Sequence, residues 1–313
     1  MADGSWSLRT RLLFLALVVF WALNYPFVNY GLDFAGPLWL ATLRAATGAA
    51  ATIPIVIALG GHRSLDRAGM RDALLLGVPN TALFFGAWFV AAQSVLPGTA
   101  AVVIYTFPLW VAVLSPLVLS QRLTAVHWLA VAAGFGGVAL ISQIGEGAAV
   151  SIAPLPIALL LAAAFSWAVG TVLIRRRFRS SELLQVSALQ LVGGTAALLI
   201  ATLLLAPTPL PVLAPGLGIS LLWMGVLGTG AAYAIWFDLL GRTSAARLSA
   251  FVFLVPVVAL AASVFYFGER LADLQIVGVV LVLLSIFGIS REPLPKAPSG
   301  AGAASSTPAN APR

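Results

Sequence analysis

Aromatic and amide side chains recur inside stretches of this sequence that are otherwise almost wholly apolar. Trp21 and Asn24 are one helical turn apart, and Asn80 precedes Phe84 by one turn and Trp88 by two. Rings with a few neutral donors and acceptors suit an uncharged or zwitterionic small molecule with an apolar or aromatic side chain. The candidate substrate-binding residues are Trp21, Asn24, Asn80, Phe84, Trp88, Tyr105, Trp167, Tyr233 and Phe253.

Two prolines stand deep inside apolar stretches, Pro108 and Pro256. Proline lacks a backbone donor and its ring clashes with the carbonyl four residues earlier, so the carbonyls of Ile104 and Val252 should lose their helical partners. Freed carbonyls at that depth could accept from a substrate ammonium, and the two sites could act as hinges. A static kink whose carbonyl bonds a nearby hydroxyl is the alternative.

Charged residues at membrane depth are scarce. Arg44 lies about seven residues into an apolar stretch, where it either extends its side chain to the surface or meets a substrate carboxylate or helix end inside. None of the ten Asp and Glu residues falls in the middle of such a stretch. A buried carboxylate is the usual proton relay or cation partner in a membrane protein, so the sequence favours uniport and disfavours a strongly cationic substrate.

The composition requires that lipid is the solvent around most of the chain. Of 313 residues, 61% are hydrophobic and 9% are charged, whereas soluble domains average about 25% charged. The absence of cysteine excludes disulfides and thiolate chemistry. His62 and His127 fall in short polar links, which leaves an intramembrane enzyme without a nucleophile–base pair at depth. We therefore expect no catalytic residues, no metal and no other cofactor.

The elements that carry these residues are predicted to be transmembrane helices of about 20 residues. Their apolar runs are continuous, which excludes an outer-membrane barrel. The predicted spans are 8–30, 37–59, 72–93, 98–119, 126–143, 154–174, 183–206, 217–239, 246–267 and 273–290. With the N-terminus inside, 15 of the 17 Lys and Arg fall in cytoplasmic links and Arg270 alone falls outside, so both termini are predicted to be cytoplasmic. The net charge of +7 thus reflects topology and does not point to nucleic acid.

The sequence matches itself at a shift of 148, which places Trp88 on Trp236 and Pro108 on Pro256. Near the start of each half the shift is 146. Each half holds five predicted spans, and an odd number makes the two halves enter the membrane from opposite faces. Inverted repeats typically hold a substrate site between halves that rock against each other, so we expect alternating access. The predicted domains are a first five-helix repeat (1–148), an inverted second repeat (149–290) and a disordered cytoplasmic tail (291–313).

Four short segments carry a likeness to a known family: Phe20–Asn24, Ala41–Arg44, Ser249–Pro256 and Gly268–Leu271. In these segments the chain resembles the drug/metabolite transporter superfamily, EamA type, and the resemblance covers about residues 10–290. The first half departs from the pattern by carrying Gln121 where the second half has Glu269, which puts a symmetric pair of acids in doubt. Within the superfamily the chain is most similar to bacterial aromatic amino acid exporters.

Resemblance and residues together lead to one expected function. It is a multi-pass secondary transporter of the bacterial inner membrane that exports aromatic and other neutral amino acids. Two alternatives stay open. One is an exporter of drugs or other small metabolites, with or without proton coupling; the other is a membrane assembly or sensor protein without flux. The expected partners are the bilayer and a small-molecule substrate, without nucleic acid, and we expect a monomer.

Overall fold

A computed structural model describes residues 8–60, 65–119, 124–142, 154–242 and 254–291. All regular elements in these residues are helices; η2 and η4 are π-helical and η3 is a 3-10 turn. They are α1 (Leu8–Gly31), α2 (Pro37–Ala58), α3 (Arg67–Leu75), η2 (Val78–Leu83), α4 (Phe84–Ala91), α5 (Pro97–Ile104), α6 (Phe107–Leu119), α7 (Ala125–Ser142), α8 (Pro154–Arg177), η3 (Ser180–Glu182), α9 (Leu183–Leu205), α10 (Pro215–Leu221), η4 (Leu222–Ala231), α11 (Ala232–Arg242), α13 (Leu254–Phe267) and α14 (Asp273–Arg291).

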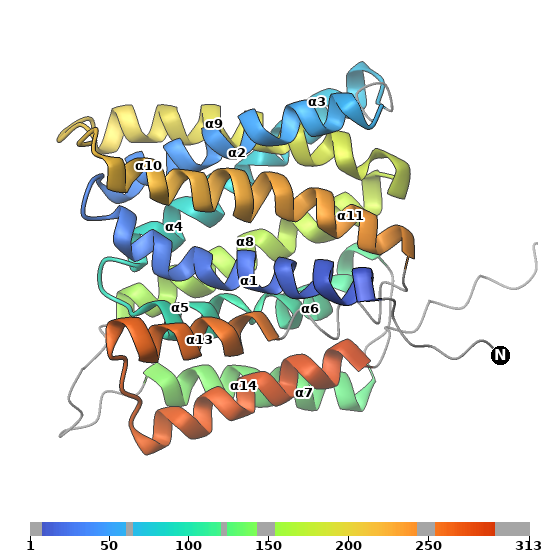
Figure 1. The fold of residues 1–313 in the computed structure, drawn as a ribbon. Coiled ribbons are helices and arrows are strands. Elements are labelled where there is room, and N and C mark those ends of the chain that lie inside the picture. The colour runs from blue at the N-terminus through green and yellow to red at the C-terminus, as the bar shows by residue number, and fades with distance from the viewer. Residues whose placement is uncertain (1–7, 61–64, 120–123, 143–153, 243–253, 292–313) are drawn as a thin grey trace, which may run out of the picture.

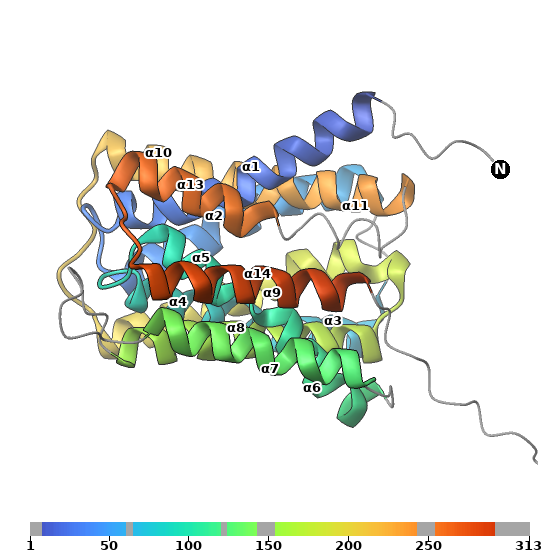
Figure 2. The same cartoon turned by 90° about the horizontal axis from the view of Figure 1, so that it is seen from below.

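The helices lie side by side in one bundle, with their long axes roughly parallel or antiparallel to one another (Figures 1 and 2). Within the described residues, seven helical stretches are long and apolar enough to cross a bilayer. Three shorter apolar helices accompany them: Ala125–Ile141, Leu254–Phe267 and Asp273–Gly288. The fold is therefore all-helical and of membrane-protein type, while the ten crossings and the cytoplasmic termini stay predictions. The predicted tail at 292–313 lies outside the described residues.

Helices α2 and α9 pack against each other and run in opposite directions. At one end of the bundle, the backbone N–H of Leu65 donates to the Gln185 side chain at the start of α9 (3.0 Å). At the other end, Val212, which follows α9, donates to the carbonyl of Phe34, which precedes α2 (2.7 Å). The shift of 146 equates these two helices, so their opposite directions support the inverted repeat, which stays a prediction.

Small residues let the equivalent helices of the two halves exchange the same contacts. A Cβ added to Gly48 on α2 would meet Thr229 of η4, and one added to Gly194 on α9 would meet Thr81 of η2. The shifts of 146 and 148 relate the two glycines and the two threonines respectively. Each half therefore packs its second span against the third span of the other half, and α1 also contacts η4 while α2 also contacts α4.

The fourth predicted span is broken near Pro108. Helix α5 ends at Ile104 and α6 begins at Phe107, and the hydroxyl of Thr106 donates to the carbonyl of Val103 (2.7 Å). Pro108 thus stands in the first turn of α6, where its missing donor costs little. The structure shows a discontinuity there, and a hinge role stays a prediction. Pro256 lies in the first turn of α13, and Val252 lies outside the described residues.

Two polar residues expected in links are buried in the fold. His127 lies in the first turn of α7, 1% exposed, with Nδ1 at 2.6 Å from the Thr124 hydroxyl. Glu269 follows α13, and its carboxylate accepts the backbone N–H groups of Gly98 and Thr99 at 3.0 and 2.9 Å. An anion is stabilised at a helix N-terminus, so Glu269 ties the loop before α14 to the start of α5.

Candidate functional site

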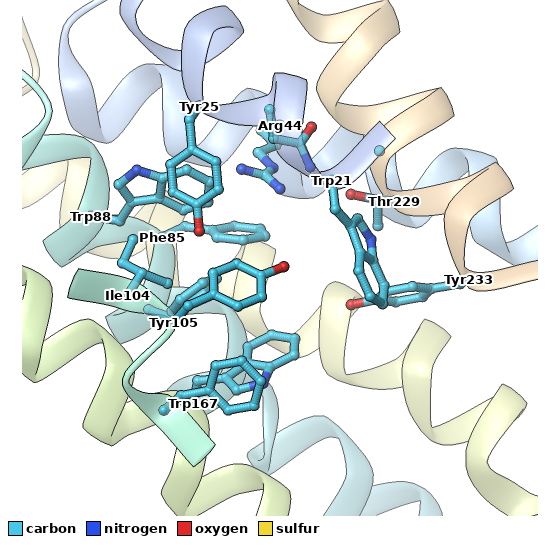
Figure 3. A pocket seen from close by; sticks show the side chains of 14 residues that line it. Trp21, Tyr25, Arg44, Phe85, Trp88, Ile104, Tyr105, Trp167, Thr229 and Tyr233 are labelled. Atoms are coloured by element: carbon cyan, nitrogen blue, oxygen red, sulfur yellow. The ribbon is translucent and has the colours of Figure 1, made fainter. Parts of the chain in front are cut away.

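The bundle contains a partly open cavity of about 120 Å³, walled by side chains from several helices (Figure 3). Its size is comparable with that of engineered apolar cavities of ~150 Å³ that take up benzene. Residues of α1, α2, η4 and α11 form part of the wall, and residues around the α5–α6 break, with α4 and α8, form the rest. The lining residues are Trp21, Asn24, Tyr25, Arg44, Phe84, Phe85, Trp88, Ile104, Tyr105, Phe107, Trp167, Gly228, Thr229 and Tyr233.

Most of the predicted binding residues meet at this cavity, although they come from both halves of the chain. The seven that line it are Trp21, Asn24, Phe84, Trp88, Tyr105, Trp167 and Tyr233. Asn80 is not among the lining residues, because its side-chain N–H donates to Gln190 of α9 at 2.8 Å. Its contacts are those of helix packing, the alternative for a polar side chain inside a membrane bundle. Phe253 lies outside the described residues.

Contacts between rings hold the cavity wall in place. The rings of Tyr25 and Trp88 have centroids 4.6 Å apart, and those of Phe84 and Trp167 are 4.8 Å apart. Each distance lies in the range of favourable aromatic pairs, which contribute about 0.5–1.5 kcal/mol beyond their buried area. Because each pair joins two different helices, the wall is a fixed surface that an apolar or aromatic ligand group can pack against.

Arg44 is buried at the cavity, and the alternative that its side chain extends to the surface is wrong. The residue is 4% exposed, and its guanidinium carbon lies 4.2 Å from the centroid of the Phe85 ring and 4.9 Å from that of Trp88. Its Nε and Nη1 atoms have no hydrogen-bond partner. In Figure 3 the guanidinium points toward the space that the Tyr105 hydroxyl also faces. The contacts with these rings help to stabilise the buried guanidinium, because a cation over an aromatic face is attracted to it.

The two asparagines pack on glycines of the opposite half. Asn24 of α1 lies against Gly228 of η4, and Asn80 lies against Gly170 of α8, so that a Cβ on either glycine would clash with the amide. The shifts of 146 and 148 exchange these pairs, because Asn24 corresponds to Gly170 and Asn80 to Gly228. The same shift pairs Arg44 with Gln190, the partner of Asn80. The same asparagine–glycine contact therefore occurs twice. Arg44 accompanies it at the cavity, and the neutral Gln190 accompanies it at the helix contact of Asn80.

The sequence prediction missed half of the lining, although some of it could have been found. Tyr25 follows Trp21 by four residues, so the two share a helix face. Thr229 and Gly228 carry no chemical signal, since they line the cavity through the packing of η4 on α1 and α2. No Asp or Glu lies close to Arg44 in the sequence, so no ion pair could be predicted for it. A position at the membrane surface was therefore one of its two predicted positions.

The described lining offers an aromatic surface with few charged or polar groups. Within the described part of the chain, the lining residues include one cation, three phenols, two neutral polar side chains and no carboxylate. Among the described residues, no three His, Asp or Glu side chains come together as ligands for a metal. The wall thus offers an aromatic surface and one positive charge to a small molecule.

Comparison with known proteins identifies the family. The chain matches the EamA-like transporter family over residues 8–143 and again over residues 154–291. A probable amino-acid metabolite efflux pump of Escherichia coli (strain K12) is 30% identical, over 90% of this chain and 96% of that protein. The uncharacterized transporter YvbV of Bacillus subtilis (strain 168) is 28% identical, over 89% of this chain and 90% of that protein.

Two further matches agree. The uncharacterized inner membrane transporter YedA of E. coli (strain K12) is 25% identical, over 89% of this chain and 92% of that protein. A solved crystal structure aligns with a TM-score of 0.62 at 18% identity, covering 90% of this chain and 97% of that one, and so shares the fold. The chain is a multi-pass protein of the bacterial inner membrane and belongs to the EamA-like transporter family.

Proposed function

We propose that this membrane transporter exports amino acids, aromatic and other neutral ones, and that the central cavity is the substrate site. The observation that carries the proposal is an aromatic cavity to which both halves of the chain contribute. Its volume of about 120 Å³ is close to that of apolar cavities that bind benzene, which suits one aromatic side chain. The relative named a probable amino-acid metabolite efflux pump supports an amino acid substrate.

The proposed mechanism is uniport by alternating access. The substrate enters the cavity from the cytoplasm, and the two halves then rock to open it on the other side. The absence of a carboxylate from the described cavity lining supports uniport, because no group there would carry a coupling proton. The discontinuity between α5 and α6 abuts the cavity at Tyr105 and supports a hinge at that point.

Counterflow in liposomes tests the proposal. The purified protein is reconstituted, the vesicles are loaded with one unlabelled amino acid from a panel, and uptake of labelled L-phenylalanine is followed. We expect transient accumulation when phenylalanine, tyrosine, tryptophan or leucine is inside and none when lysine is inside, with protein-free vesicles as the control. No accumulation with any amino acid of the panel would contradict an amino acid substrate, and counterflow of drug-like cations would favour the drug exporter.

A separate experiment tests direction. Cells that express the chain are grown with the toxic analogue p-fluorophenylalanine. An exporter lowers the internal concentration of the analogue, so we expect growth at concentrations that stop control cells. Increased sensitivity would show net import and contradict export.

A further inference from the structure

We propose that Arg44 binds the carboxylate of the substrate, so that the transporter selects carboxylic acids with an apolar or aromatic body and does not require their ammonium group. Amino acids are then one member of a wider substrate class. The inference rests on the proposed function in one respect only, that the central cavity is the substrate site.

The first argument is that the charge of Arg44 is buried and unpaired. The residue is 4% exposed, and neither Nε nor Nη1 has a hydrogen-bond partner. The ion pairs within the described residues join Asp72 to Arg71 and to Arg177, and Arg44 takes part in neither. A buried cation without a counter-ion is costly, and a bound anion would offset that cost.

The second argument is that aromatic rings contact the guanidinium without using its donors. The centroids of the Phe85, Trp88 and Phe89 rings lie 4.2, 4.9 and 5.6 Å from its central carbon. A ring face attracts the cation but accepts no strong hydrogen bond, so the N–H donors at the edge of the guanidinium can still bind an anion. That edge matches the two oxygens of a carboxylate, which it can bind with two parallel bonds.

The third argument is the balance of charge in the wall. Among the lining residues that the structure describes, Arg44 is the single cation and no Asp or Glu accompanies it. A monoanion neutralises this site, whereas a phosphate monoester brings close to two negative charges at neutral pH and would leave one unpaired. An ammonium finds no anionic group in this described lining and has only aromatic faces and neutral oxygens to approach. The carboxylate is therefore the required group and the ammonium is optional.

Competition among four related ligands tests the inference in the unaltered protein. The ligands are L-phenylalanine, 3-phenylpropanoate, phenylalaninamide and phenethylamine, which share the ring and differ in their charged groups. Binding is followed by the tryptophan fluorescence of the purified protein, to which Trp21, Trp88 and Trp167 of the cavity contribute, and competition is followed by counterflow of labelled phenylalanine. We expect 3-phenylpropanoate to bind at least as well as phenylalanine, and the amide and amine at least tenfold more weakly, since hydrogen bonds to a charged group are lost. Equal or tighter binding of the amide or amine would overturn the inference.

Substitution of Arg44 adds a second test. Arg44→Gln should abolish the preference for the acid over the amide, whereas Arg44→Lys keeps the charge and should keep part of it. Arg71→Gln, at a side chain that is 73% exposed, is the matched control and should leave the preference unchanged. A preference that persists in Arg44→Gln would overturn the assignment, and the ligand series in the unaltered protein decides the matter if that variant does not fold.

The two levels of the proposal fail in different ways. Counterflow of phenylalanine that the amide inhibits as well as the acid does would leave the amino acid exporter standing and overturn the role of Arg44. Binding of 3-phenylpropanoate without counterflow of any amino acid would overturn the proposed function and support the role of Arg44. Binding of none of the four ligands would overturn both.

Discussion

At the scale of single residues, the cavity depends on rings that other rings hold in place. Trp21 lies 5.5 Å from Trp236 between ring centroids, and Tyr105 lies 6.5 Å from Tyr25. Both line the cavity: Trp21 lies on α1, and Tyr105 lies in the break between α5 and α6. Removing either ring would reduce the area that contacts the ligand. It would remove no charge and no hydrogen bond between the described helices.

We predict that Trp21→Ala and Tyr105→Ala each weaken substrate binding about tenfold, because one aromatic contact is worth on the order of 1 kcal/mol and more with its buried area. The measurement is the half-saturation concentration for counterflow, at matched protein content in the vesicles. Trp128→Ala is the control, since Trp128 is 55% exposed on α7 and does not line the cavity. Normal transport by both cavity variants would contradict the assignment of the site.

How far the site could be predicted depends on what decides the position of each residue. Depth within an apolar run favoured a cavity position for Trp21, Tyr105 and Trp167, and all three are among the lining residues. Depth does not distinguish a cavity from a helix contact, and Asn80 therefore appeared equivalent to Asn24. Its position follows from Gln190, which lies 110 residues away in sequence and which no local pattern connects to it.

At the scale of elements, the reciprocal packing of asparagine on glycine joins the two halves around the cavity. Gly228 belongs to η4, which packs against both α1 and α2. A side chain there would push η4 away from Asn24 and so displace Thr229 and Tyr233, which line the cavity immediately after it. The glycine is needed for this close approach and not for an unusual backbone angle.

We predict that Gly228→Ala lowers both thermal stability and transport, because the added Cβ would overlap Asn24. Overpacking of this kind typically costs about 1–3 kcal/mol. The melting temperature of the purified protein and its counterflow rate are the two measurements. Gly218→Ala is the matched control on the neighbouring α10, where an added Cβ meets nothing within 4 Å. Equal effects of the two substitutions would contradict the packing argument.

The apolar runs predicted the helices well, and the irregular segments poorly. The predicted run at 98–119 corresponds to α5 and α6, and only the proline indicated that it is not one helix. The π-helical segments η2 and η4 were not predicted, because they arise where glycine and threonine of one half fit the other. Hydropathy reports that a segment is buried in lipid or protein, and it carries no information on how neighbouring segments interlock.

At the scale of the whole molecule, the proposal is a carrier that equilibrates its substrate. The cavity combines residues of both halves and contains no carboxylate within its described lining. Glu269, a buried acid, already accepts hydrogen bonds from the start of α5, so its charge has a structural partner. A uniporter of this kind needs no ion gradient to move its substrate.

We therefore predict that counterflow of phenylalanine proceeds at the same rate whether or not a pH difference is imposed across the vesicle membrane. The initial rate of counterflow is measured at equal pH on both sides of the membrane. It is then compared with the rate at a difference of about one pH unit in either direction. As the control, a protonophore is added to the vesicles that have a pH difference, and it should not change the rate. Concentrative uptake that follows the pH gradient and collapses with the protonophore would contradict uniport.

The central claim, that substrate occupies this cavity, has a direct test because the chain contains no cysteine. A single cysteine is introduced at Tyr233 in the cavity wall, and its labelling rate by a small maleimide is measured with increasing phenylalanine. Gly36→Cys is the control, in the loop before α2, where an added side chain meets nothing within 4 Å. The account predicts that phenylalanine slows labelling of Tyr233→Cys at the concentrations that half-saturate its transport and leaves Gly36→Cys unaffected. Labelling of Tyr233→Cys that is unchanged while phenylalanine is transported would contradict it.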